Sequence, residues 1–587
     1  MEDALATVDA IADRTFAEWK VPGVVYGVIV GGALRHSRGL GTIRVGEDAT
    51  PDADSVFRIA SMTKSFTAAA ILSLRDEGRL RLDDPIADHL PRLAGLRGPT
   101  TDSPPITIRH LLTMTAGFPT DDPWGDRQQG LDTDAFLDLV ARGLTFAWAP
   151  GTRFEYSNLG YGILGRLVTA VAGREYREVV RERLLEPLGM PSTGYLEAEV
   201  APERLARGYV WRDGTFLDEP MDGYGALASM GGVFTTVRDL VTWVNGFIDA
   251  FPPRDEPGMA HPLRRASRRE MQQPMVPIDP GVTFRTADAH PELDTGAYGF
   301  GLFVNDHLRW GRIVGHSGGY PGFGSNMRWH PPSGLGVIAL ANGRYANSAA
   351  LAGEMLIALL EAEAAPSRRV AAAPPTLAAR AAVETLLERW DDALAGRLFA
   401  MNVELDEPLR RRRAAIEKLR DTHGRLTPDP AEPPVANSPF DLAWWLRGER
   451  GGRVKVELLL TPEVPPLVQA MDLTSVPEPP AELRAAAERI CAALAMADDR
   501  APVWPAELAL AGGVDAAELA RAMRAAEARF GAVHLGPVLA GDGTRTATFR
   551  LECSRGRLEL QLERDPATGQ FTKVRLRPVR LAAAAFD

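Results

Sequence analysis

Apolar and polar positions predict strands at both ends of the first 365 residues. An apolar run over 24–30, the pair Gly31-Gly32 and a second run from Ala33 predict a β-hairpin, because two glycines supply the positive φ angles of a tight turn. A helix over 3–19 precedes this hairpin. Later strands are expected at 299–305, 311–317, 324–330 and 335–341, with Ser333-Gly334 turning the last pair.

Between these strands the apolar positions recur at helical spacing. Helices are expected at 107–115, 134–142, 159–172, 175–186 and 236–248, and one over 347–365 closes the block. The run TAAAILSL from Thr67 is apolar nearly all round, so its helix, which stops near Gly78, is expected to be central and buried. The pattern predicts one α/β (α+β) domain over residues 1–365, whose sheet joins the hairpin to the late strands.

The pattern changes after residue 365. The segment PSRRVAAAPP, residues 366–375, is rich in proline and alanine and is expected to be a linker. RVKVELLL from Arg453 alternates apolar and polar residues, and RLELQLE from Arg557 does so again 104 residues later. Each is followed by a proline and a second strand. We therefore expect two smaller α+β modules, 376–476 and 481–587, that arose by duplication; two unrelated domains that both alternate are the alternative.

Composition and charge narrow the classes of function. The chain has 587 residues and a net charge of −11, which argues against a nucleic-acid partner. The basic run Arg410–Arg413 is interpreted as the solvated face of a helix. No signal-peptide pattern and no apolar run near the roughly 18 residues that span a bilayer are found, so we expect a cytoplasmic protein without a membrane partner. The two cysteines, Cys491 and Cys553, exclude a disulfide framework or a multi-thiolate metal site.

The unit SMTK places Ser61 and Lys64 one helical turn apart in an apolar setting. A serine hydroxyl needs a neighbouring base to become a nucleophile, and a buried lysine can be that base if its pKa is lowered. Positions i and i+3 share one face of a helix, and the helix N-terminus favours negative charge that develops there. The alternative makes Ser61 a helix cap and Lys64 an exposed residue of the first turn.

Two later segments add polar groups of the same chemistry. Tyr156 and Asn158 are separated by one residue, so in an extended segment both can face one side; a tyrosine beside a lysine can have its phenolate stabilised and relay a proton, and an asparagine can hold a substrate carbonyl. Alternatively, Tyr156 is a rim aromatic and Ser157-Asn158 cap the following helix. His316-Ser317-Gly318-Gly319 ends a strand-like run, where small residues let a backbone approach a ligand; the alternative for His316 is an ordinary surface residue.

In this order, the motifs S-x-x-K, Y-x-N and H-x-G resemble the penicillin-recognising serine hydrolases. The resemblance is to the branch of class C β-lactamases, D-Ala-D-Ala carboxypeptidases, D-aminopeptidases and β-lactamase-fold esterases. It extends to LDDPI at 82–86, TIRHLLTMTAGF at 107–118, LLEPLGM at 184–190 and LASMGGVFTT at 227–236. A β-lactamase/transpeptidase-like domain, with an antiparallel sheet flanked by helices, is what the resemblance implies.

The resemblance also implies the roles of the site residues. Ser61 would be the acylated nucleophile, Lys64 its general base and Tyr156 the proton relay. Asn158, His316, Ser317 and Gly318 would contact the substrate, and the amides of Ser61 and Gly319 would form the oxyanion hole. No metal or organic cofactor is implied.

One departure bears on the substrate. Class C β-lactamases have a lysine where this chain has His316, and a histidine is charged only in part at neutral pH. The substitution disfavours efficient β-lactamase action. We expect a hydrolase that forms an acyl-enzyme on Ser61 and cleaves small esters, or amides and short peptides with D-residues.

Three alternatives remain at this stage. They are a penicillin-binding-protein-type thioesterase or acyltransferase, a weak β-lactamase, and a non-catalytic scaffold on the same fold. The C-terminal modules are expected, by analogy with D-aminopeptidases, to restrict substrate size or to mediate a homodimer. The loops 119–133 and 251–295, which would shape the pocket, match no pattern.

Overall fold

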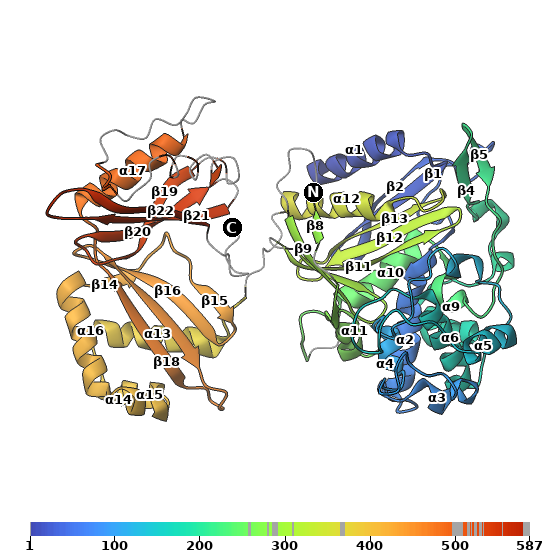
Figure 1. The fold of residues 1–587 in the computed structure, drawn as a ribbon, viewed down its shortest axis with the longest axis horizontal. Helices are drawn as coiled ribbons and strands as arrows, with labels where there is room; N and C mark the ends of the chain where they lie inside the picture. The colour runs from blue at the N-terminus through green and yellow to red at the C-terminus, as the bar shows by residue number, and fades with distance from the viewer. Residues whose placement is uncertain are drawn as a thin grey trace. The chain divides into compact units, whose positions relative to one another are not determined.

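In the computed structural model, the N-terminal hairpin consists of β1 (Gly23–Val30) and β2 (Ala33–Gly41). β1 also pairs with β13 (Leu335–Ala341), so the first strands join the last ones as the sequence predicts. The other strands of this sheet are β12 (Phe323–His330), β11 (Gly311–Tyr320), β10 (Phe303–His307), β9 (Glu292–Tyr298), β8 (Gly281–Thr283) and β7 (Val276–Pro277). The antiparallel order is β2-β1-β13-β12-β11-β10-β9-β7, with β8 paired to β9 (Figure 1).

The chain divides into two units, Met1–Pro366 and Ser367–Asp587. The structure describes residues 2–255, 260–278, 281–283, 292–307, 310–363, 370–495, 509–512, 517, 519, 521, 525, 526, 531, 533–553 and 556–578. Of the loop 251–295, for which the sequence gives no pattern, residues 256–259, 279–280 and 284–291 lie outside these ranges.

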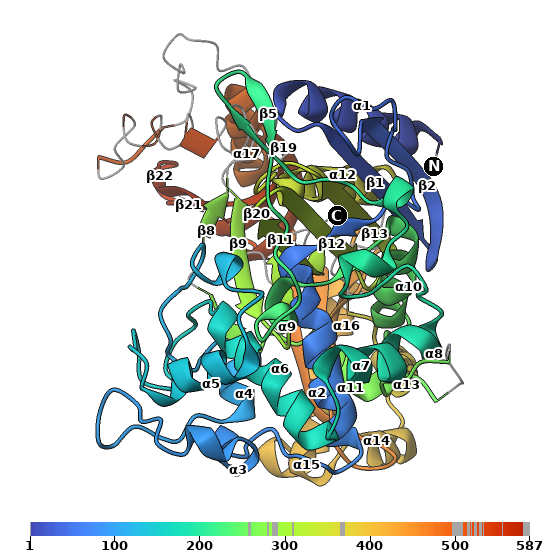
Figure 2. The same cartoon turned by 90° about the vertical axis from the view of Figure 1, so that its right-hand side faces the viewer.

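Helices cover both faces of the large sheet. α1 (Glu2–Glu18) and α12 (Ser348–Ala362) pack on one face around Val24, Tyr26 and Val28 of β1. α10 (Val237–Ile248) covers the opposite face, and α2 (Thr63–Asp76) lies deeper on that side, in contact with α6 and α9 (Figure 2). Every residue of α2 from Thr63 to Leu74 is buried, which confirms the prediction of a central helix.

Smaller elements complete the first unit. Its helices are α3 (Ile86–His89), α4 (Ile108–Leu112), α5 (Thr133–Ala141), α6 (Asn158–Ala172), α7 (Tyr176–Val180), α8 (Glu186–Leu188), α9 (Ala228–Gly231) and α11 (Arg265–Met271). Two short antiparallel pairs are added: β3 (Phe57–Arg58) pairs with β6 (Phe234–Thr235), and β4 (Tyr209–Arg212) forms a hairpin with β5 (Thr215–Asp218). The helices expected at 107–115, 134–142, 159–172 and 236–248 are therefore all present.

Two expected elements differ in extent. The strand expected over 299–305 starts only at Phe303, because residues 299–302 form a turn in which Gly301 has a φ of 68°. A Cβ on Gly301 would lie 2.5 Å from the carbonyl oxygen of Lys64, so glycine lets this turn reach α2. The helix expected over 175–186 has a wider π turn at Arg181–Leu185, just before Pro187, whose ring and missing N–H disturb a regular α-helix.

The second unit contains two modules, each with an antiparallel sheet. In the first, β14 (Leu426–Pro428), β16 (Asp441–Gly448), β17 (Arg453–Leu460) and β18 (Val468–Val476) pair in that order, β15 (Val435–Ser438) joins β16, and the helices are α13 (Pro374–Glu388), α14 (Asp392–Leu398), α15 (Met401–Asp406) and α16 (Leu409–His423). The second has α17 (Ala481–Ala495) and the sheet β19 (Val533–Gly541), β20 (Thr546–Cys553), β21 (Gly556–Arg564), β22 (Phe571–Pro578). The two alternating segments are β17 and β21; their origin by duplication stays a prediction.

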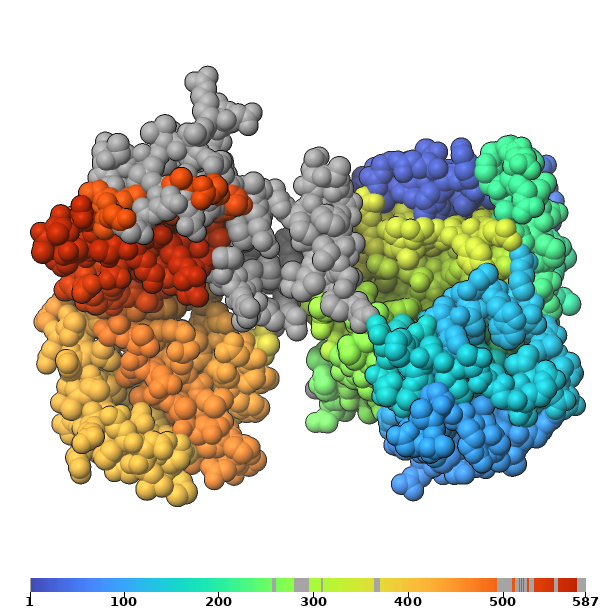
Figure 3. Space-filling view, viewed as in Figure 1, coloured from blue at the N-terminus to red at the C-terminus, as the bar shows by residue number. Residues whose placement is uncertain are grey.

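The two modules are joined by buried charges. Arg453 donates to a side-chain oxygen of Asp429 at 3.0 Å and to the carbonyl oxygen of Val538 at 3.1 Å. Arg550 reaches Glu432 at 3.0 Å. Because these partners come from both modules, the modules lie directly against each other (Figure 3). Pro374 and Pro375, expected in the linker, occupy the first turn of α13, where a missing N–H is tolerated.

Within the described ranges, no helix combines the length and the apolarity that crossing a bilayer requires.

Candidate active site

Ser61 lies in a tight 3₁₀ turn, Ala60–Met62, directly before α2. Ala60 has a φ of 48°, a left-handed backbone that residues other than glycine rarely adopt and that is often found in functional turns. β12 fixes the turn, because the Ser325 hydroxyl donates to the carbonyl oxygen of Ile59 at 2.7 Å. No side chain caps α2 at this end, so the interpretation of Ser61 as a helix cap is wrong.

Lys64 is fully buried, which also overturns the alternative of an exposed first-turn lysine. Its Nζ lies 2.9 Å from Ser61 Oγ, 2.7 Å from Asn158 Oδ1 and 2.9 Å from the carbonyl oxygen of Met230. The amide oxygen and the carbonyl oxygen can only accept hydrogen bonds. A neutral amine would therefore give its two N–H groups to Asn158 and Met230, and its lone pair would face the Ser61 hydroxyl.

The pKa of Lys64 is suited to a base. Burial lowers it to about 8, against the carboxylates of Asp122, Asp126 and Asp121, which raise it. An ordinary lysine is almost entirely charged at neutral pH, whereas about one-tenth of a group with this pKa is neutral at pH 7. A fraction of Lys64 is therefore neutral near pH 7 and able to accept a proton.

Asn158 is the first residue of α6, and the hydroxyl of the preceding Ser157 accepts from Gly160 N at 3.1 Å, so Ser157 caps the helix as one alternative proposed. Asn158 is fully buried. Its oxygen accepts from Lys64 and its nitrogen donates to the carboxylate of Asp122. The structure therefore gives Asn158 a role in orienting Lys64, while the expected contact with substrate stays a prediction.

Tyr156 lies beside both residues of the S-x-x-K motif. Its hydroxyl hydrogen-bonds Ser61, and its ring centroid lies 4.9 Å from Lys64 Nζ. Burial and the nearby carboxylates of Asp122 and Asp126 raise the pKa of Tyr156 well above its usual value. The phenol is therefore protonated, in contrast to the stabilised phenolate that the sequence suggested. A protonated phenol at this position can still hand a proton to a leaving group.

His316 is buried, with 2% of its surface exposed, so the alternative of a surface histidine is wrong. Its Nδ1 lies 2.5 Å from the carbonyl oxygen of Ser317 and its Nε2 lies 3.1 Å from the Tyr298 hydroxyl. Burial, together with the Lys64 charge, lowers the pKa of His316 to about 3, so the ring is neutral rather than partly charged. A neutral imidazole with Nδ1–H donating to Ser317 leaves Nε2 to accept from Tyr298.

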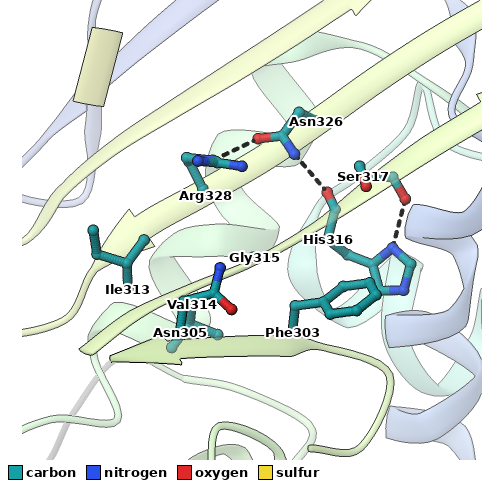
Figure 4. Close-up of a pocket in the computed structure, with 9 residues that line it drawn as sticks. All are labelled: Phe303, Asn305, Ile313, Val314, Gly315, His316, Ser317, Asn326 and Arg328. Carbon is teal, nitrogen blue, oxygen red and sulfur yellow. Dashed lines mark hydrogen bonds between the residues drawn. The ribbon is translucent and has the colours of Figure 1, made fainter. Parts of the chain in front are cut away.

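The strand that carries His316 is also held by side chains of the neighbouring strand β12. Figure 4 shows Asn326 donating to the carbonyl oxygen of His316 at 3.4 Å and accepting from Arg328 at 3.0 Å. These side chains line a small cavity of about 180 Å³ that shares Phe303, His316 and Ser317 with the cavity described next.

One cavity of about 620 Å³ brings the three sequence motifs together. Its walls include Ser61, Tyr156, His316, Ser317 and Gly319, and it is completed by Asp122, Pro123, Asp126, Phe154, Phe303 and Tyr345. This volume is in the range of small-molecule sites. The residues assigned to the oxyanion hole, Ser61 and Gly319, share this cavity. Gly318 faces inward, where a Cβ would lie 2.2 Å from the carbonyl oxygen of Ile59, so it lets β11 pack against the nucleophile turn.

Sequence reasoning missed the acidic side of the site. Asp121, Asp122 and Asp126 come from the loop 119–133, for which no pattern was found. Asp121 accepts from the backbone N–H groups of Asn158 and Leu159, each at 2.7 Å. Burial raises the pKa of Asp126 to about 6, with a further contribution from Asp122. The available signal was the cluster DDPWGD at 121–126 itself, which two residues separate from the segment TIRHLLTMTAGF that ends at Phe118.

Comparisons with known proteins agree with this geometry. The family described as "Beta-lactamase" matches residues 8–362. The chain is 30% identical over 259 residues to D-alanyl-D-alanine-carboxypeptidase/endopeptidase AmpH of Escherichia coli K12, covering 42% of this chain and 63% of that protein. It is 25% identical over 344 residues to protein flp of Staphylococcus aureus COL, covering 58% of this chain and 63% of that protein. The chain thus spans less than two thirds of either relative.

A solved structure covers both units. The octameric penicillin-binding protein homologue from Pyrococcus abyssi matches 98% of this chain and 98% of its own, with a TM-score of 0.52 and 18% identity. At this identity the likeness concerns the fold alone. It supports the β-lactamase/transpeptidase-like architecture followed by further sheet modules.

Proposed function

The chain belongs to the beta-lactamase family, within the penicillin-recognising serine hydrolases, and on that premise we propose that it is a hydrolase acting through a covalent acyl-enzyme on Ser61. The observation that supports this most directly is the environment of Lys64 Nζ. Two of its three contacts are obligatory acceptors, and the third is the Ser61 hydroxyl at 2.9 Å. An amine so held can remove the proton of the hydroxyl beside it.

Acylation follows from these contacts. Lys64 takes the Ser61 proton as Oγ bonds to the acyl carbon, and the amides of Ser61 and Gly319 stabilise the resulting oxyanion. The bond to the leaving group then breaks, and the leaving group takes the phenolic proton of Tyr156, which the Lys64 ammonium replaces. Water hydrolyses the acyl-enzyme by the same proton path in reverse. Asn158 acts in this scheme by holding Lys64.

The charge of the cavity bears on the substrate. Among its described lining residues the charged side chains are Asp122 and Asp126, and none is a lysine or arginine. His316 is neutral, since burial lowers its pKa to about 3. A substrate carboxylate would meet these acids with no lysine or arginine in the lining to pair with it, whereas a neutral ester or a protonated amine would not be repelled. We therefore propose small esters and D-aminoacyl amides as substrates rather than β-lactams.

A panel of chromogenic substrates tests this assignment. We expect kcat/KM for p-nitrophenyl acetate and D-alanine p-nitroanilide to exceed that for nitrocefin, whose carboxylate would face the two acids. N-succinyl-D-alanine p-nitroanilide is the matched control, because it replaces the amine of the D-alanine substrate with an anion. It should be turned over at least about tenfold more slowly than D-alanine p-nitroanilide, equivalent to about 1.4 kcal/mol. Nitrocefin as the best substrate would contradict the proposal.

The pH dependence is expected to report Lys64. The protonated amine is inactive, so kcat/KM should rise as pH increases through about 8, by about tenfold from pH 7 to the plateau. In Asp122→Asn this rise should move to lower pH, because the carboxylate that most favours the ammonium is gone. Asp132→Asn is the matched control, since Asp132 caps α5 and asparagine caps as well. A rise that stays in place, or moves to higher pH, in Asp122→Asn would assign it to another group.

A further inference from the structure

Tyr345 spans the catalytic cavity from one wall to the other. Its ring packs on Gly319, where a Cβ would lie 2.8 Å from Tyr345 Cδ1. Its hydroxyl donates to Asp126 Oδ2 at 2.8 Å. Gly319 lies on β11, Asp126 lies in the loop 119–133, and both line the cavity. The tyrosine therefore connects the strand of the oxyanion hole to the acidic wall.

The position of Tyr345 is at the mouth of the cavity. It lines the cavity and yet keeps 42% of its surface exposed. Its φ of 49° is in the left-handed region, which tyrosine rarely adopts and which tends to persist where surrounding structure imposes it. The Tyr345 N–H donates to the carbonyl oxygen of Tyr320 at the end of β11, at 3.3 Å, and so ties this backbone to the same strand.

An ion-pair cluster holds the two segments that meet at this contact. Arg127 follows Asp126, and Arg344 precedes Tyr345. Both arginines pair with Glu219, at 3.2 Å and 2.8 Å, and the Glu219 side chain is only 6% exposed. One nearly buried carboxylate that pairs with both arginines holds the two segments near each other. The ion pairs therefore support the hydrogen bond between Tyr345 and Asp126.

We propose that Tyr345 is a specificity-determining residue that closes the mouth of the cavity and limits the length of the acyl group the enzyme accepts. This inference rests on the proposed acyl-enzyme at Ser61. The leaving group is assigned to the side of Tyr156, whose hydroxyl protonates it. The acyl group then extends past Gly319, beneath the ring of Tyr345, and a short acyl chain fits in the closed cavity while a long one meets the ring.

Two substitutions separate the ring from its hydrogen bond. Tyr345→Gly removes the ring and suits the left-handed backbone, so it avoids the strain of other small residues. Tyr345→Phe keeps the ring on Gly319 and loses the bond to Asp126. The readout is the ratio of kcat/KM for p-nitrophenyl octanoate to that for p-nitrophenyl acetate. We expect this ratio to rise at least tenfold in Tyr345→Gly and by a smaller factor in Tyr345→Phe.

Controls distinguish this proposal from the proposed function. Trp211→Ala removes an aromatic residue that is 40% exposed and outside the cavity lining, and its ratio should match the wild type. If a small fluorophosphonate labels Ser61 in a Tyr345 variant, that variant still has its nucleophile. If the wild-type protein is not labelled, the proposed function itself is contradicted. An unchanged ratio in a labelled Tyr345→Gly protein would overturn the role of Tyr345. So would a change confined to a series of acetate esters with leaving groups of increasing size.

Discussion

Replacing Ser61 with alanine is expected to abolish covalent labelling by a fluorophosphonate probe and to reduce kcat for p-nitrophenyl acetate by on the order of 10⁶-fold, the scale measured when a catalytic serine is removed. The reason is that Ser61 is the hydroxyl in contact with Lys64 Nζ. Its position before the N-terminus of α2 also favours the charge that develops during attack. Intact-mass and peptide mass spectrometry would measure the adduct.

Ser317 provides the matched control, because it is the other serine in the lining of the cavity. Ser317→Ala should still be labelled at Ser61, since the contact between Ser61 and Lys64 does not involve it. Labelling that persists in Ser61→Ala and maps to Ser317 would show that Ser61 is not the nucleophile. If no acylating agent labels the wild-type protein at all, the scaffold alternative gains support.

The sequence was sufficient for the parts of the site that are local. Ser61 lies in the turn that leads into α2 and Lys64 lies three residues later in its first turn, so their contact needs little from the rest of the fold. The helix that carries Lys64 was recognisable because its own residues are apolar nearly all round, and the structure buries it from Thr63 to Leu74. The joining of β1 to β13 was also predictable, since strands at both ends of a mixed domain need partners.

Contacts between distant segments were not predictable in this way. Asp126 and Tyr345 are 219 residues apart, and the packing of two loops that carry no periodic pattern brings them together. The same holds for the carbonyl oxygen of Met230, which takes one N–H of Lys64 although its segment was recognised only as part of a family resemblance. Backbone groups have no signature in a sequence.

The burial of His316 was predictable from its strand, although its position suggested the opposite. A histidine at the end of an apolar run is usually exposed, which was the simpler interpretation. Along β11, however, Val314, His316, Gly318 and Tyr320 are all buried, with the alternation of a strand that turns one face to a core. Following this alternation of buried and less buried positions to Tyr320 would have predicted that His316 is buried. Its neutral charge then follows from burial and the nearby lysine.

Replacing Lys64 with arginine is expected to lower acylation of Ser61 by on the order of 10²- to 10⁴-fold, the usual contribution of a general base. A guanidinium keeps its proton at any pH the protein tolerates, so it can retain the charge but cannot accept the serine proton. Lys64→Met is the complementary variant, because it fills a similar volume without a charge or a proton acceptor. Stopped-flow measurement of the acylation burst would report the step directly.

The two variants together test the base rather than the fold. Lys64→Met leaves Asn158 Oδ1 and the carbonyl oxygen of Met230 without their buried donor, which costs stability as well as activity. Lys64→Arg keeps donors in the site, so a comparable loss of acylation in both variants points to the missing proton acceptor. The rise of activity near pH 8 should disappear from the residual rate of each. If Lys64→Met retained that rise, the titrating group would be a different one, and Tyr156 or Asp126 would have to take the place of Lys64 in the mechanism.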